Sequence, residues 1–444
     1  MNKFIAFFVA IGKWFKNVGI SIGKWFKNWF VPVDDKAIIP VRIGRWFKSL
    51  FVKTDDVDEP RLKTLLKKDG VKSFVATLMS IFIGIFIGFL IMLYKPSNAF
   101  VGLKYLLLGS FSNAPKTIGD ALFDATPLIM TGLSVAFAYK VGLFNIGAPG
   151  QYLMGTLFSL LVALNFHGPV WLVWICAVLA GAVGGALWGA IPGLFKAFLN
   201  INEVIASIMC NWIAINFVAW IFSGSSMTNP SINSYVKKPI DVTGVTNPKL
   251  GLDKIFVGSQ KIDCTILIAI AIAIIAYIIM NKTTFGFELQ ATGKNKFAAK
   301  YAGIKDKRNI ALSMIIAGSF AGLGAAMYWL SNQNAYQWQN TSSLPAVGFN
   351  GIPVALLASS NPIGVILSAY FIAHINIGGF YVTSNTVYNE KITDIIVAVV
   401  VYLSAFSMLF KGQITKWMTP KTNTKQIVEV IDVNDSADDG EESK

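Results

Sequence analysis

Long runs of apolar residues, separated by short polar connections, occupy most of the chain between residues 74 and 410. Several runs reach about 20 residues, the length that an α-helix needs to cross a bilayer core. Charged residues make up only 14% of the 444 residues, well below the share typical of soluble proteins. Because ionised side chains are costly in hydrocarbon, this pattern predicts an all-α fold, a polytopic bundle of transmembrane helices.

We expect about ten spans, at 74–94, 121–139, 145–164, 169–195, 204–222, 264–280, 309–330, 346–358, 361–378 and 392–410. The range 346–358 is short for a span and contains Gly348, Gly351 and Pro353. It can cross fully, cross as a broken helix, or re-enter. We favour a crossing or a broken helix, because irregular backbone at membrane depth is tolerated where it lines a cavity.

The distribution of basic residues sets the expected orientation. Residues 1–73 hold 15 Lys and Arg against seven acidic residues, and residues 281–308 hold seven against two. Both regions should be cytoplasmic, because Lys and Arg concentrate in loops on that side. We therefore interpret the net charge of +14 as topology rather than as nucleic-acid binding. The prediction is a multi-pass cell membrane protein with both termini in the cytoplasm.

An extension at 1–73 precedes the apolar region 74–410, and a polar tail at 411–444 follows it. The extension repeats the sequence IGKWFKN at 11–17 and 22–28, with IGRWFKS at 43–49. On a helix, its aromatic residues share one face and its lysines another, as in helices that lie on a membrane surface. We expect contact with membrane lipids; the alternative is packing on the protein's own cytoplasmic surface. The acidic tail is predicted to be disordered.

The residues that usually mark catalysis or metal binding are sparse. Cys176, Cys210 and Cys264 lie in or beside apolar runs, and His167 and His374 are far apart. This spacing predicts no disulfide framework, metal site or catalytic group. The phosphate-binding motif Gly-x-x-x-x-Gly-Lys-Ser/Thr does not occur in the sequence, so we expect no cofactor bound by this chain and no ATPase activity of its own.

Four stretches resemble one family. They are GLFNIGAPGQYLMGT at 142–156, NINEVIASIMCNWIA at 200–214, ATGKNKFAAKYAGI at 291–304 continuing into 307–326, and GFNGIPVALLASSNPIG at 348–364. Together they are similar to the permease subunits of ATP-binding cassette importers for simple sugars, nucleosides and branched-chain amino acids, most of all to the nucleoside branch. The resemblance covers roughly residues 74–410. Pro149 stands where family members usually have an acidic residue.

The resemblance implies a complex. A second permease, the same or homologous, would complete the pathway, and ATPase subunits carrying ATP and Mg would drive it. An extracellular substrate-binding protein would deliver a small polar substrate. A proton-coupled secondary transporter is the alternative, because Asp124, His374 and Asp394 lie at membrane depth, where ionisable residues usually face a cavity or a partner. The same type of importer could also carry simple sugars.

We assign the pathway or gate to polar and small residues within the resembling stretches. Asn145 and Gln151 offer amide groups where two glycines and a proline disturb the start of a span; close helix packing is the alternative. Glu203, at the start of the next helix but one, can cap that helix, gate the pathway or contact the ATPase. The full set is Asn145, Gly147, Gly150, Gln151, Glu203, Asn211, Phe349 and Asn350.

The basic loop at 281–308 should hold a short helix. Phe297, Tyr301 and Ile304 are spaced i, i+4, i+7 and would share its apolar face. Such a helix can dock in a groove of a partner, and the resemblance implies that this partner is the ATPase; an ordinary basic loop is the alternative. The predicted coupling residues are Lys294, Asn295, Phe297, Ala298, Ala299, Tyr301, Ala302, Gly303 and Ile304.

On the external side, aromatic and amide residues alternate at 328–340. This mixture could stack on and hydrogen-bond a sugar or a nucleobase, or contact the binding protein; aromatic anchoring at the membrane interface explains it equally well. The predicted external contacts are Trp329, Asn332, Tyr336 and Trp338.

Overall fold

The computed structural model describes residues 69–405, apart from 233, 340–342 and 390, together with residue 412. Residues 73–416 form one compact unit. Almost all described residues belong to this unit. The predicted surface helix within 1–73 and the predicted disordered tail at 411–444 lie outside the described residues, except for the first turn of α4 and residue 412, so both stay predictions.

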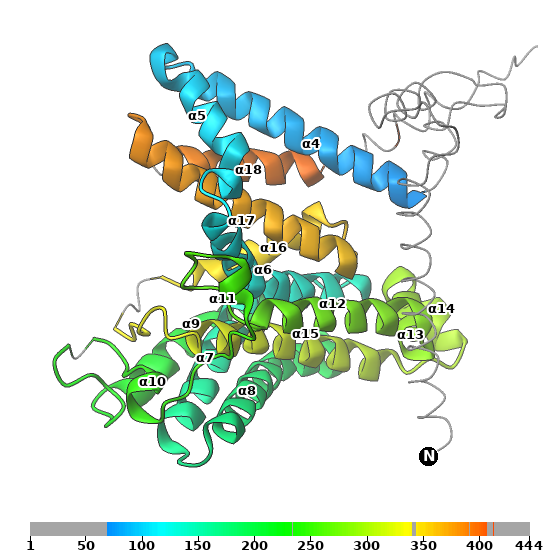
Figure 1. Ribbon diagram of the computed structural model, residues 1–444. Coiled ribbons are helices and arrows are strands. Elements are labelled where there is room, and N and C mark those ends of the chain that lie inside the picture. Colours follow the sequence, from blue (N-terminus) through cyan, green and yellow to red (C-terminus); the bar gives the residue numbers. More distant parts are fainter. Residues whose placement is uncertain (1–68, 233, 340–342, 390, 406–411, 413–444) are drawn as a thin grey trace, which may run out of the picture. The chain divides into compact units, whose positions relative to one another are not determined.

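Every regular element among the described residues is a helix, as predicted (Figure 1). The ten predicted ranges correspond to α4 (Asp69–Met92), α6 (Lys116–Lys140), α7 (Ala148–Asn165), α8 (Val170–Leu199), α9 (Glu203–Phe222), α12 (Thr265–Lys282), α15 (Asp306–Trp329), α16 (Ala346–Leu357), α17 (Pro362–Asn385) and α18 (Lys391–Ala405). The remaining helices are α5 (Pro96–Leu108), η1 (Gly109–Phe111), α10 (Pro239–Val242), α11 (Leu252–Ile255), α13 (Thr284–Lys294) and α14 (Lys296–Tyr301).

Seven of these helices, among the described residues, are long and apolar enough to cross a membrane: α4, α6, α8, α9, α12, α15 and α17. The chain is therefore a multi-pass membrane protein, while the exact number of spans stays a prediction. Helix α16 has 12 residues, about 18 Å at the helical rise, and cannot cross a core of about 30 Å alone. It ends before Ser359 and Ser360, which have φ of 49° and 55°, and α17 begins after a new cap at Asn361.

Glycines bring α8 against α15 in the middle of the bundle. Gly181 and Gly185 of α8 face Gly318 and Gly322 of α15 so closely that a Cβ at position 322 would lie 2.1 Å from the carbonyl oxygen of Gly181. Without a hydrophobic drive between helices in lipid, such close backbone contact is a main source of association. The pair supports α7, since Gly155 of α7 lies on Gly322.

Helix α5 was not predicted, because its 13 residues are too few for a span. It lies beside α17 and α4, where Ala99 and Leu106 are buried with Met92 and Val382. The connection from α4 to α5 is fixed by the Tyr388 hydroxyl, which donates to the carbonyl of Lys95 at 2.9 Å. Short apolar helices of this kind gain their stability from packing on neighbours rather than from their own sequence.

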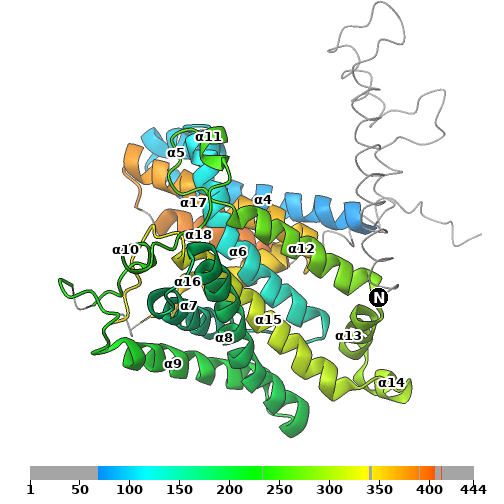
Figure 2. The same cartoon turned by 60° about the horizontal axis from the view of Figure 1, so that its bottom comes forward.

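The two ends of the bundle carry different elements. Helices α13 and α14 lie at one end of α12 and α15, and α10 and α11 lie at the other (Figures 1 and 2). Helix α4 runs antiparallel to α18, since Ser80 bonds the carbonyl of Leu403 at 3.2 Å and Gly88 contacts Ile396. The beginning of α4 and the end of α18 therefore lie at the same end of the bundle, the end that also holds α13 and α14 (Figure 1).

Candidate functional site

The 281–308 loop folds into the helix pair α13 and α14, each with its own capping residue. The Thr283 hydroxyl accepts from the Gly286 N–H at 3.1 Å, and the Asn295 side chain accepts from the Ala298 N–H at 3.0 Å, which satisfies donors that a helix start leaves free. Helix α13 rests on the end of α6, where a Cβ on Gly293 would come within 2.5 Å of the Lys140 carbonyl oxygen. The loop is therefore an ordered platform.

Helix α14 presents two aromatic side chains to solvent on one face. Phe297 is 83% exposed and Tyr301 is 99% exposed, while Ala299 between them is buried against the platform. Large aromatic surface is seldom left in water unless a partner covers it. The short helix was predicted correctly, but the inclusion of Ile304 on its face was wrong. The helix ends at Tyr301, Gly303 turns the chain with φ of 77°, and Ile304 is half-buried beyond it.

Charged residues surround this aromatic pair. Lys294, Lys300 and Lys305 are exposed, while Lys296 pairs with Asp306 at 3.5 Å. Arg308 donates to Glu288 at 2.8 Å and so ties the start of α15 to α13. The other predicted coupling residues, Ala298, Ala302 and Gly303, are exposed beside the pair.

A buried network of amide groups lies where α7 begins. Asn145 donates to Ser134 of α6 at 2.9 Å and to Gln151 of α7 at 2.8 Å. The Gln151 amide donates back to Asn145 at 3.0 Å, and the Asn145 oxygen also accepts from the Gly147 N–H at 3.1 Å. Both side chains are almost completely buried, so in this conformation they bind each other and not a solute.

Asn211 of α9 completes the network from the other side. Its oxygen accepts from the Gly150 N–H at 2.9 Å, and its amide donates to the Ile146 carbonyl at 2.9 Å. Gly150 is required there, because a Cβ would lie 2.6 Å from the Asn211 oxygen. The structure thus brings five of the eight predicted pathway residues into one cluster that joins α6, α7 and α9: Asn145, Gly147, Gly150, Gln151 and Asn211.

Glu203, Phe349 and Asn350 lie outside this network. Glu203 pairs with Lys196 at 2.9 Å, and the side chain that caps α9 is that of Asn202, which accepts from the Val204 N–H at 2.8 Å. The alternative of Glu203 as the capping side chain was therefore wrong. Phe349 is exposed and Asn350 half-buried on α16, next to Gly348, which packs on Pro149 at the start of α7.

Three of the predicted external residues, Asn332, Tyr336 and Trp338, lie in the loop that follows α15, and Trp329 is the last residue of that helix. The 331–339 stretch pairs with the 223–263 loop, since Val236 N–H donates to the Tyr336 carbonyl at 2.8 Å and Trp338 N–H to Ser234 at 3.0 Å. Both polar atoms of the Asn332 side chain bond backbone groups. Its oxygen accepts from the Ile240 N–H at 3.1 Å, and its nitrogen donates to the Val245 carbonyl at 2.9 Å. Asn332 therefore fixes the loop and has little capacity left for a solute.

The aromatic side chains of this loop are packed together. The ring centroids of Trp329 and Tyr336 lie 5.1 Å apart in an edge-to-face arrangement, and burial raises the pKa of Tyr336. The indole N–H groups of Trp329 and Trp338 are buried without a hydrogen-bond partner among the described residues. Because both donors are buried, another molecule could reach them only after this loop moves.

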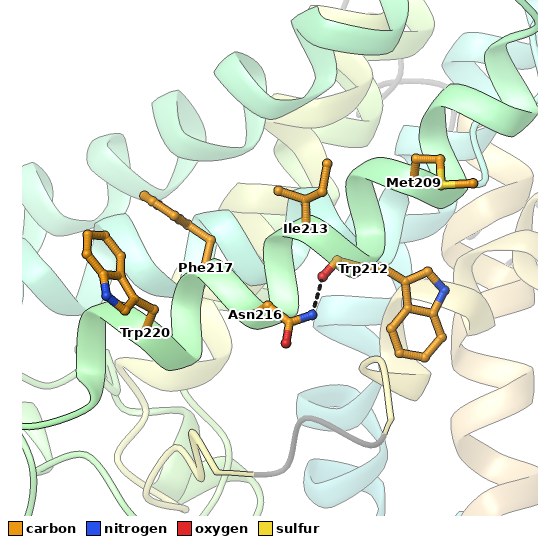
Figure 3. A pocket seen from close by; sticks show the side chains of 6 residues that line it. All are labelled: Met209, Trp212, Ile213, Asn216, Phe217 and Trp220. Carbon is orange, nitrogen blue, oxygen red and sulfur yellow. Dashed lines mark hydrogen bonds between the residues drawn. The ribbon is translucent and has the colours of Figure 1, made fainter.

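One candidate surface was missed by the sequence analysis. Six side chains of α9 line a shallow hollow on the outside of the protomer: Met209, Trp212, Ile213, Asn216, Phe217 and Trp220 (Figure 3). Trp220 is 70% exposed and Trp212 47%. The signal was present, because Trp212, Asn216 and Trp220 recur every four residues along the span and so share a face. It was obscured by the apolar character of the whole run.

The ionisable residues at membrane depth do not form a relay among the described residues. His374 Nδ1 accepts from the Ser110 N–H at 3.1 Å, and its Nε2 faces the Leu107 carbonyl at 3.2 Å, so both nitrogens are used to fix the chain before α6. Asp394 pairs with Lys391 at 3.1 Å. Asp124 lies near Asp120 and Lys261 instead. Across the described ranges, His, Cys, Asp and Glu form no group suited to a metal ion.

Comparison with known proteins gives a consistent result. A family model described as the permease component of branched-chain amino acid transport systems matches residues 117–405. The guanosine ABC transporter permease protein NupP of Bacillus subtilis is 35% identical over 335 residues, 74% of this chain and 92% of that protein. The nucleoside ABC transporter permease protein NupB of Lactococcus lactis is 34% identical over 344 residues, 76% and 92% of the two chains.

A sugar permease is also similar, at lower identity. The glucose ABC transporter permease protein TsgB13 of Haloferax volcanii is 30% identical over 298 residues, 66% of this chain and 77% of that protein. No solved structure matches the chain.

Proposed function

The chain belongs to the family of permease components of branched-chain amino acid transport systems, and we propose that it is the membrane-spanning subunit of an ATP-driven nucleoside importer. The proposal of a nucleoside as the substrate rests on the similarity to NupP and NupB, which extends over 92% of the length of each. The glucose permease is less similar by identity and coverage, so a sugar is the second candidate. The alternative of coupling to protons has no support from the contacts of Asp124, His374 and Asp394.

The partners follow from the arrangement of exposed surfaces. A separate ATPase would bind the aromatic pair of α14, Phe297 and Tyr301, and would carry the ATP and Mg. A second permease, identical or homologous, would complete the pathway. An extracellular binding protein would contact the loops at the other end of the bundle. In this scheme the chain moves the solute, and hydrolysis of ATP takes place on the partner.

The orientation belongs to the same proposal. The end of the bundle with α13 and α14 faces the cytoplasm, because seven Lys and Arg stand against two acids in 281–308. The antiparallel contact of α4 with α18 supports termini on one side, since the chain enters α4 and leaves α18 at that same end. The repeats in 1–73 would then lie at the inner leaflet, where their basic faces can bind anionic lipid.

The amide network is proposed as the inner hinge of the pathway. It connects α6, α7 and α9 through side chains that have no solvent contact. Movement of α7 against α9 must break the bonds of Asn211 to Gly150 and Ile146, and new partners must replace them. Networks of this kind favour two discrete arrangements over a continuous range, which is what alternating access requires.

Purification of the intact complex tests the composition. The chain is tagged, extracted in mild detergent and isolated, and the co-purifying proteins and small molecules are identified by mass spectrometry. We expect an ATP-binding cassette ATPase in stoichiometric amount, and ATP hydrolysis that rises when nucleoside and the binding protein are added. Isolation of the chain with no ATPase, or hydrolysis that responds to sugars and not to nucleosides, would contradict the proposal.

A further inference from the structure

Helix α9 has two chemically different faces. Its inner face buries Ser207, Asn211 and Ala214 against α7 and α8, and carries the amide that completes the network. Its outer face carries the hollow, in which every lining side chain comes from α9 itself (Figure 3). Trp188 of α8 contacts this face at Phe217, and most of the face stays exposed in the described part of the protomer, so its chemistry indicates what meets it in the assembled transporter.

Lipid alone does not explain the outer face. Asn216 is exposed in the middle of the span, where hydrocarbon offers no hydrogen-bond partner. Its Nδ2 donates to the Trp212 carbonyl at 2.8 Å (Figure 3), which leaves the side-chain oxygen as a free acceptor. Polar side chains at this depth generally face a partner or a water-filled space rather than lipid tails.

A tightly packed helix of a second permease does not explain it either. The close helix contacts of this chain use glycine, as between α8 and α15, and small residues dominate such contacts in membranes generally. The hollow instead has large side chains with space between them. Three are aromatic. The ring of Phe217 contacts two others, stacked on Trp188 with centroids 6.4 Å apart and tilted against Trp220 at 5.9 Å, and Trp220 is the most exposed of the three.

We propose that this hollow lines the solute pathway and that a nucleobase stacks there on Trp220 while Asn216 accepts one of its N–H groups. Flat aromatic side chains are the usual partners of unpaired bases, and one amide can select an edge. This inference rests on the proposed nucleoside function and adds the contact site to it. A base bound on the outer face of α9 is also connected through the helix to Asn211 and the hinge network.

Transport by variants of the reconstituted complex tests the contact. Trp220→Ala and Asn216→Ala should each raise the KM for guanosine uptake about tenfold, the size expected for loss of base stacking or of a paired hydrogen bond, while Trp220→Phe retains most of the affinity. Trp171→Ala is the matched control, since Trp171 is 65% exposed on α8 and lies outside the hollow. Unchanged KM in both alanine variants overturns the inference.

Thiol labelling tests whether water and solute reach the hollow. In a chain with Cys176, Cys210 and Cys264 replaced by Ala, Ile213→Cys should react with a small cationic methanethiosulfonate, and guanosine in the complete complex should slow the reaction. Ala214→Cys, on the buried face of the same helix, should not react. An inert Ile213→Cys means that lipid or another helix covers the face, and a rate insensitive to guanosine means that no base binds; either result overturns the inference.

The proposed nucleoside function and the proposed contact site on α9 can fail separately. If the unmodified complex takes up no nucleoside, the proposed function is contradicted and the contact site falls with it. If the unmodified complex takes up guanosine but the Trp220 and Asn216 variants behave as the Trp171 control does, the function stands and the assignment of the hollow is wrong.

Discussion

At the scale of single residues, Asn145 is the centre of the buried hydrogen-bond network at the start of α7. Its side chain bonds Ser134, Gln151 and the backbone of Gly147, all of them buried. A buried group that loses its partner costs about 1–3 kcal/mol, although polar contacts between membrane helices are on average weaker. Asn145 therefore fixes the start of α7 through several bonds, none of which needs to be strong.

Replacing Asn145 with Ala should destabilise the permease by roughly 2 kcal/mol, because Gln151, Ser134 and the Gly147 N–H are left without a partner. Uptake should fall as well, since the hinge loses its fixed position. The midpoint of thermal unfolding in detergent and the uptake rate are the measurements. Asn165→Ala, at the far end of α7, is the control, because this exposed side chain donates to the Leu161 carbonyl at 2.8 Å and to the Met227 sulfur at 3.3 Å and to no buried amide network. Equal stability of the two variants would remove Asn145 from this role.

The network residues could be predicted in part from the sequence. Two glycines and a proline beside Asn145 and Gln151 mark an irregular helix start, and the family resemblance adds Asn211. The partners of these amides could not be predicted, because the contact between Gly150 and Asn211 joins residues 61 positions apart. Ser134 of α6 has no sequence feature that distinguishes it from other serines.

At the scale of elements, α14 is a short helix whose position is fixed by contacts that do not involve its two aromatic side chains. The Asn295 cap, the burial of Ala299 and the pair Lys296–Asp306 fix its backbone. Phe297 and Tyr301 contribute to none of these contacts, since both side chains are almost fully exposed. The helix can therefore lose both aromatic rings without losing its fold.

The double variant Phe297→Ala with Tyr301→Ala should leave folding intact and weaken assembly with the ATPase. Burial of a large aromatic side chain contributes about 2–3 kcal/mol, and truncation of an interface hot spot often costs about 2 kcal/mol or more. We expect at least a tenfold loss in the amount of ATPase retained by the purified permease, or ATP hydrolysis that no longer drives uptake.

The control for this variant is Tyr94→Ala with Phe100→Ala. Both residues are highly exposed and lie where α4 leads into α5, at the end of the bundle away from α14. This control should assemble normally. Normal assembly and normal uptake by the Phe297 and Tyr301 variant would show that α14 does not couple the two subunits.

The contact of α8 with α15 gives a second prediction for an element. Gly322→Ala places a Cβ against the backbone of Gly181, so the helices must separate along their length and α7 loses its support. Overpacking of this kind costs about 1–3 kcal/mol or more, and we expect a lower unfolding midpoint and reduced yield. Gly168→Ala, where a Cβ would have its nearest neighbour at 3.7 Å, should be neutral. A Gly322 variant as stable as that control would contradict the packing described.

Helices were predicted well where a long apolar run marks them, and poorly where contacts with neighbouring helices determine their position or their end. Apolar length located ten of the helices, because burial in lipid imposes a long uniform run. It missed α5, which is apolar but short. The i, i+4, i+7 spacing placed Ile304 on a helix that stops at Tyr301. The hollow on α9 was missed for a related reason: in a span that is apolar on all sides, hydropathy does not tell which face other helices cover.

At the scale of the whole molecule, the described unit has an ordered platform at one end and packed loops at the other. The buried amide network and the hollow of α9 lie between them, on opposite faces of α9. The class of fold could be predicted from composition and apolar runs, and the family from four short stretches.

Uptake of labelled guanosine into liposomes tests the central claim most directly. The complete complex is reconstituted, with the binding protein on the substrate side and ATP on the side of α13 and α14. The account predicts accumulation that requires ATP, stops when the ATP is replaced by a non-hydrolysable analogue, and continues when a protonophore collapses the proton gradient. Uptake that continues without ATP and stops with the protonophore would contradict it, and would identify a proton-coupled carrier instead.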